Sequence, residues 1–149
     1  MGFLYIILSF FGTSVLTHEV PIAIFRIYEE NQVLLMEVTL DQQDLRNELV
    51  IEDETINTSL IQNYLNEKTE FFFDSRKSNY KIMKLQFEND HIRISGKFSN
   101  VQPDFKKIEL YNTCLNSIDS HSNIIRLELR NQERGFRMHK KRQNINIDY

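Results

Sequence analysis

The sequence predicts a mainly β fold, an antiparallel β-sandwich or open barrel of about eight strands with two short α-helices inserted after the second strand. Three observations predict it. Apolar and polar residues alternate with a period of two along most of the chain, turn residues separate these runs, and helical spacing is confined to two neighbouring segments. With 149 residues, 41% hydrophobic and 26% charged, the chain fits one domain with its own core.

The first strands are predicted as a hairpin of residues 22–27 and 33–40, joined by a polar turn. The period then changes from that of a strand to that of a helix. A short helix follows Asp41, the predicted N-cap, because its two leucines lie four residues apart. A second helix follows Thr58, also a plausible N-cap.

Strand patterns return after the second helix. They cover residues 71–73, 80–87, 92–98, 105–111, 125–130 and 136–139. Asn89 with Asp90, then Pro103, then Gly135 mark turns between them. Residues 145–149 alternate as well and could form a last strand that pairs with a partner chain by strand addition.

The segment 1–17 is predicted to be a signal peptide. It carries no acidic or basic group, its apolar core is too short to span a bilayer, and small residues follow that core. An uncleaved N-terminal anchor or a buried first strand is the alternative. Residues 18–149 then form a single β-rich domain, exported to the periplasm or cell envelope. Cys114 is the one cysteine, so no intramolecular disulfide can form.

The chain also resembles a known family in the order of several short segments. These are an export signal ending near a His, then residues 35–40, 44–49, 112–115 and 122–125. On these segments it looks like a family of exported Bacteroidetes domains of unknown function, although Glu19 and Val20 separate His18 from Pro21 and the C-terminal basic run is heavier. The resemblance implies an envelope location and a β-rich fold, and it implies no activity.

Charge is unevenly distributed along the chain. Residues 18–74 hold 13 acidic against 3 basic side chains, and residues 75–149 hold 8 against 15. The basic side chains concentrate at Arg126, Arg130, Arg134, Arg137, Lys140, Lys141 and Arg142. This cluster could bind an anionic surface or an acidic envelope protein, or it could mark the solvated face of antiparallel strands. Nucleic acid is not expected as a partner, because the chain is acidic overall.

The histidines offer one metal hypothesis. Cleavage after Thr17 would make His18 the N-terminus, where its amine and imidazole could chelate copper with a second His nearby. His91, His121 and His139 lie in separate segments and are expected to be ordinary histidines, and no cofactor is expected.

Catalytic patterns are absent from the sequence. It has no Gly-x-Ser-x-Gly, no His-Glu-x-x-His and no glycine-rich phosphate loop. Residues 119–122 combine Asp, Ser and His, yet adjacent residues cannot form a converging triad, so a turn is expected there. We therefore expect a non-catalytic exported interaction or envelope-structural module. The alternative is a periplasmic binding protein for a small hydrophobic ligand or a metal ion.

Overall fold

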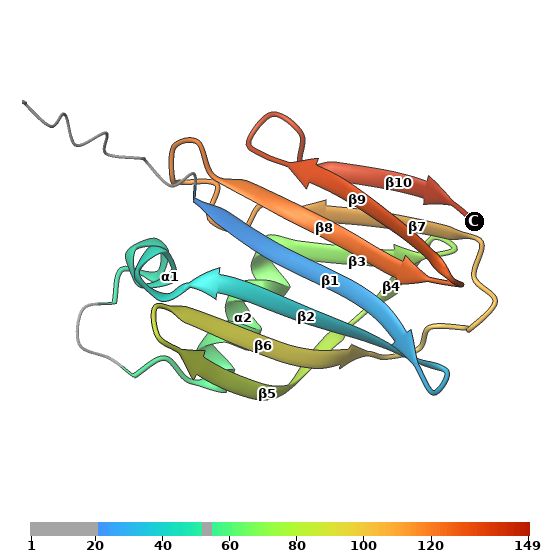
Figure 1. The fold of residues 1–149 in the computed structure, drawn as a ribbon, viewed down its shortest axis with the longest axis horizontal. Helices are drawn as coiled ribbons and strands as arrows, with labels where there is room; N and C mark the ends of the chain where they lie inside the picture. Colours follow the sequence, from blue (N-terminus) through green and yellow to red (C-terminus); the bar gives the residue numbers. More distant parts are fainter. Residues whose placement is uncertain (1–20, 52–54) are drawn as a thin grey trace, which may run out of the picture.

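The computed structural model describes residues 21–51 and 55–149, so the predicted signal peptide and His18 lie outside the described residues. Two β-sheets pack face to face, and two helices lie toward one end (Figure 1). The elements are β1 (Ile22–Glu30), β2 (Val33–Asp41), α1 (Gln42–Leu49), α2 (Thr58–Lys68), β3 (Thr69–Phe73), β4 (Arg76–Ser78), β5 (Tyr80–Glu88), β6 (His91–Phe98), β7 (Lys107–Asn112), β8 (Ser122–Leu129), β9 (Gln132–Met138) and β10 (Asn144–Asp148). Neither helix has the length and apolar character needed to cross a membrane.

The predicted fold class is confirmed: the described chain is mainly β, a sandwich-like pair of open sheets with two helices after β2. One sheet has six strands in the order β5-β6-β2-β1-β8-β9, and the other has four in the order β10-β7-β3-β4. The described strands number ten rather than about eight. The three residues of β4 are too few to show alternation, and β10 was expected only as an additional strand.

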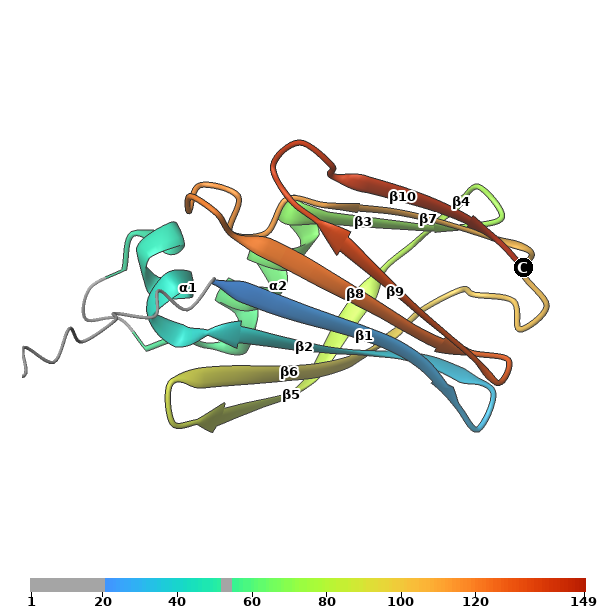
Figure 2. The same ribbon diagram turned by 45° about the horizontal axis from the view of Figure 1, so that its top comes forward.

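The strands are not all antiparallel. β1 and β8 run parallel, with Ile22 opposite Ser122 and Tyr28 opposite Glu128. After β6 the chain leaves the six-stranded sheet and forms β7 in the other sheet. It then returns to the six-stranded sheet as β8, which begins beside the start of β1 and runs in the same direction (Figure 2). The purely antiparallel prediction was therefore wrong at this one pairing.

The last hairpin of the six-stranded sheet turns earlier than predicted. Gly135 lies inside β9, opposite Arg126 of β8. The turn is made by Arg130 and Asn131, whose φ angles of 53° and 58° fit the left-handed turns that suit twisted hairpins. The side chain of Arg126 consequently lies on the same outer face of the sheet as Gly135, Glu133 and Arg137.

The helix caps follow the sequence closely. The Asp41 carboxylate accepts a hydrogen bond from the Asp44 amide at 2.9 Å, which confirms the predicted cap of α1. Asn57, rather than Thr58, caps α2, because its side-chain oxygen accepts from the Leu60 amide at 3.0 Å. Asn and Thr both satisfy free amides at a helix start, so composition alone does not decide between neighbours.

The interior between the sheets is filled by apolar side chains from both. Phe98 contacts three aromatic rings there: its ring centroid lies 4.8 Å from that of Phe71 and 5.4 Å from that of Phe73, both edge-to-face, and 5.6 Å from that of Tyr80 in a tilted arrangement. Such edge-to-face contacts stabilise beyond the area they bury. This packing fixes the two sheets as a frame and leaves the loops at the ends of the sandwich to carry binding groups.

Candidate functional site: a basic pocket at one end of the sandwich

The candidate site is a pocket of about 550 Å³ where two loops meet. One loop joins β7 to β8 and contributes Asn116 and residues 118–121, together with Ser122 at the start of β8. The other follows β9 and contributes Lys140 and Lys141, with Arg137 from the strand itself. Both loops lie at the end of the sandwich where α1 and the start of β1 are found (Figure 2).

Arg137 is held in place by the first residue of β8. Its Nε donates to the Ser122 hydroxyl at 2.9 Å, and Ser122 is itself buried while its amide donates to the Pro21 carbonyl at 3.0 Å. One of the five guanidinium donors is therefore used for positioning. The others remain for a ligand that accepts hydrogen bonds in the plane of the group.

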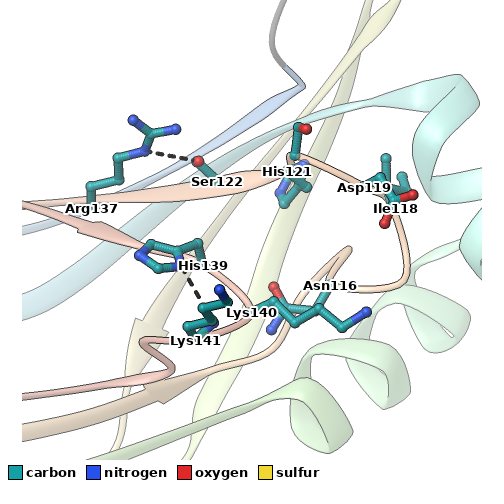
Figure 3. A pocket seen from close by; sticks show the side chains of 10 residues that line it. Asn116, Ile118, Asp119, His121, Ser122, Arg137, His139, Lys140 and Lys141 are labelled. Carbon is teal, nitrogen blue, oxygen red and sulfur yellow. Dashed lines mark hydrogen bonds between the residues drawn. The ribbon is translucent and has the colours of Figure 1, made fainter.

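A tight turn carries the two lysines. His139 and Arg142 exchange backbone hydrogen bonds of 3.0 and 2.7 Å, and the Lys141 amide also donates to the His139 ring at 3.3 Å. These bonds fix the backbone on both sides of Lys140 and Lys141, whose side chains are exposed. The turn therefore presents two flexible ammonium groups at the pocket, as Figure 3 shows.

The acidic and basic halves of the sequence interleave in the six-stranded sheet. Arg26 of β1 forms a bidentate pair with Glu128 of β8, with oxygen–nitrogen distances of 2.7 and 2.6 Å. Glu37 of β2 lies 3.8 Å from Arg93 of β6. The Glu37–Arg93 pair therefore offsets part of the charge asymmetry between neighbouring strands, whereas the Arg26–Glu128 pair joins the minority charge of each half and offsets none of it.

The pocket cations are an exception to this pairing. None of Arg137, Lys140 and Lys141 forms an ion pair with a carboxylate in the part of the chain that the structure describes. The hollow is therefore lined by three positive groups and one carboxylate, that of Asp119, and a bound anion reduces the repulsion among the positive groups.

The structure separates the predicted basic residues into different surroundings. Arg137, Lys140 and Lys141 line the pocket, and Arg142 closes the turn through its backbone. The Arg130 guanidinium lies 4.8 Å from the Phe105 ring, and that of Arg134 lies 4.8 Å from the Tyr149 ring. These two arginines tie the β8–β9 hairpin to the other sheet. Arg126 is exposed on the outer face of β8.

Two neutral residues of the pocket were missed by sequence reasoning. His121 was expected to be an ordinary histidine and Asn116 was not singled out, yet both line the pocket. Their side chains contain buried atoms without a hydrogen-bond partner among the described residues, namely Nδ1 of His121 and both amide atoms of Asn116. Burial lowers the pKa of His121, so its ring is neutral at physiological pH.

The Asp-Ser-His-Ser segment at residues 119–122 lies along the same pocket. The Ser122 hydroxyl accepts from Arg137, and the His121 ring faces the side chain of Asn123 at 3.3 Å. His121 is therefore not arranged as a base for Ser122, in agreement with the expectation of a turn.

A second group of ligand-type atoms lies nearby. Asp41, Asp90 and His91 each place one such atom within 4.8 Å of the others. The Asp90 carboxylate already contacts the His91 ring at 2.6 Å, and Asp41 caps α1. The sequence does not reveal this group, because Asp41 lies far along the chain from the adjacent Asp90 and His91 and meets them only where the β5–β6 turn approaches α1.

Comparison with known proteins adds no identity: no protein-family model matches the chain, and no curated protein matches it significantly.

Proposed function

We propose that this domain is an exported, non-catalytic interaction module that holds a negatively charged group of its partner in the pocket between the β7–β8 loop and the β9–β10 turn. One observation carries the proposal. Arg137, Lys140 and Lys141 surround the same hollow without a carboxylate partner among the described residues. The partner is an envelope protein or another anionic surface that presents such a group.

The arrangement suits recognition of one anionic group. Arg137 is held by Ser122 and offers directed donors, whereas the two lysines offer mobile point charges. A carboxylate or phosphate can engage the guanidinium in plane and take an ammonium on another side. Charges at the mouth of a pocket also speed the encounter with an anionic partner, an effect that weakens as ionic strength rises.

The exported location is part of the proposal and is supported by the apolar character of residues 1–17. N-terminal sequencing of protein purified from the envelope fraction tests it. A mature chain beginning at His18 is expected. Recovery of the uncleaved chain from the soluble cytoplasm would contradict it.

Anion binding is tested by thermal unfolding in increasing phosphate at constant ionic strength. We expect phosphate to raise the melting temperature, because a ligand that binds only the folded state stabilises it. In the triple variant Arg137→Gln, Lys140→Gln and Lys141→Gln, we expect phosphate no longer to raise the melting temperature.

The matched control is Lys81→Gln, Lys84→Gln and Lys97→Gln. It removes the same charge from exposed positions on β5 and β6 and retains the shift. An equal shift in both triple variants would place the anion elsewhere and refute the site.

A second candidate, binding of a divalent metal ion, is favoured by the Asp41, Asp90 and His91 group. Two carboxylates and an imidazole are suitable ligands for such an ion. Zinc titration followed by the His91 ring resonances tests it, with His139 as the internal control. Equal zinc broadening of both rings would count against a specific site.

A further inference from the structure

The buried side of the pocket has a defined hydrogen-bonding character, which begins at His121. This side chain is 4% exposed, and its Nε2 lies 3.3 Å from Oδ1 of Asn123. The amide nitrogen of Asn123 donates to the Cys114 carbonyl at 2.9 Å, so the oxygen that faces His121 can only accept. Nε2 of the neutral ring therefore carries the proton. Nδ1 is left as an acceptor without a partner among the described residues.

Asn116 extends this unpaired set. Its Oδ1 and Nδ2 are both buried and lack a partner in the described part of the chain. We call the side chains of Asn116 and His121 the floor of the pocket. The unpaired atoms of the floor are two acceptors, Nδ1 of His121 and Oδ1 of Asn116, and one donor, Nδ2 of Asn116. A buried polar atom left unpaired costs about 1–3 kcal/mol, so a ligand that pairs with the floor gains free energy there.

The cationic side chains and the buried floor of the pocket bind different chemical groups, which one ligand can carry together. The wall, made by Arg137, Lys140 and Lys141, supplies only donors and positive charge. A fully ionised phosphate or a carboxylate only accepts, so it satisfies the wall and leaves the floor acceptors unpaired. A hydroxyl group both donates and accepts, and can pair with Nδ1 of His121 or with either amide atom of Asn116.

From this complementarity we propose that the pocket binds an acidic sugar unit, an anion that carries hydroxyl groups beside its carboxylate or phosphate. This inference rests on the proposed function and names its ligand. The pocket volume of about 550 Å³ lies within the usual range for small-molecule sites.

Lys140 lines the same pocket as Asn116, and its side chain is exposed. Because lysine rotamers interconvert rapidly at a surface, an anion that pairs with the Lys140 ammonium can shift this side chain while the hydroxyl groups of the same ligand approach the floor.

Calorimetric titration of the full chain at constant ionic strength tests this inference. The probes are glucuronate and glucose 6-phosphate as acidic sugars, acetate and inorganic phosphate as simple anions, and glucose as the neutral sugar. We expect each acidic sugar to bind at least about tenfold more tightly than the simple anion with the same charged group, which corresponds to about 1.4 kcal/mol. Glucose is expected to bind more weakly than either acidic sugar.

Asn116→Ala tests the floor directly. The variant is expected to lose the preference for acidic sugars and to keep its affinity for inorganic phosphate. Asn63→Ala, an exposed change on α2, keeps both. If Asn116→Ala still prefers acidic sugars to simple anions, Asn116 does not contribute to sugar recognition and the inference is refuted.

The outcomes separate this inference from the proposed function. Equal affinity for glucuronate and acetate, with phosphate also bound, would refute the acidic sugar and leave the anion pocket standing. No binding of any anion would refute both.

Discussion

Replacing Gly96 by alanine should destabilise the domain markedly. Gly96 is buried in β6, and the Tyr80 ring of the neighbouring strand lies over it. A Cβ added there would approach the backbone oxygen of Lys81 more closely than any normal contact and would lie 2.7 Å from Cζ of Tyr80. The backbone cannot move without disturbing the β5–β6 pairing, and the ring is fixed by its hydroxyl, which donates to the Met36 carbonyl at 2.9 Å.

The magnitude follows from these contacts. Overpacking costs about 1–3 kcal/mol, and losing the Tyr80 hydrogen bond costs about 1 kcal/mol more. The reduced freedom of the unfolded chain offsets about 0.4–1 kcal/mol. Gly96→Ala should therefore lower the free energy of unfolding by about 1–4 kcal/mol, measured by urea denaturation with an unchanged dependence on urea concentration.

Gly135→Ala is the control for this experiment. It changes the same residue type in a strand of the same sheet, but no atom lies within 4 Å of the added Cβ. Its free energy of unfolding should stay within about 0.5 kcal/mol of the unsubstituted protein. Equal stability of the two variants would refute the packing of Tyr80 over Gly96.

Three further changes probe the residues behind the pocket. Burial lowers the pKa of His121 below the value of about 6.5 in an unfolded chain, so the unfolded state takes up this proton first and stability should fall as pH drops below about 6.5. Urea denaturation at several pH values should show this loss of stability in His91→Gln and not in His121→Gln. The same change of unfolding free energy with pH in both variants would contradict the role of His121. Tyr64→Phe removes the acceptor of the buried Leu115 amide, now 2.9 Å away, and should cost about 1–3 kcal/mol in the same assay, so an unchanged midpoint would speak against that bond. Cys114 is fully buried and its thiol pKa is raised by burial, so a thiol reagent should label it only on unfolding, and rapid labelling of the native protein would be inconsistent with the core.

The fold was largely predictable because alternation reports which face of a strand is buried. The hairpin of β1 and β2 and the pattern of β6 follow directly from it. Alternation does not report which strands are neighbours, so the parallel pairing of β1 with β8 could not be predicted. That pairing joins segments about 100 residues apart, and it depends on the path of the chain through the second sheet.

The site was predictable only in part. The basic run contains Arg137, Lys140 and Lys141, but the run gives no sign that Arg130 and Arg134 stack on aromatic rings instead. Nothing in the sequence marks His121 or Asn116, because both belong to a polar loop that is typical of an exposed turn. Their burial arises from the approach of two loops distant in sequence, and it becomes visible only in the folded chain.

The most direct test of the anion pocket is a map of backbone amide chemical shifts during titration with inorganic phosphate at constant ionic strength. We predict that the shifted amides cluster at residues 116–122 and 137–141, and that the amides around Arg126 and Arg93 stay unchanged. Shifts concentrated on the outer face of the six-stranded sheet, or no shifts at all, would contradict it.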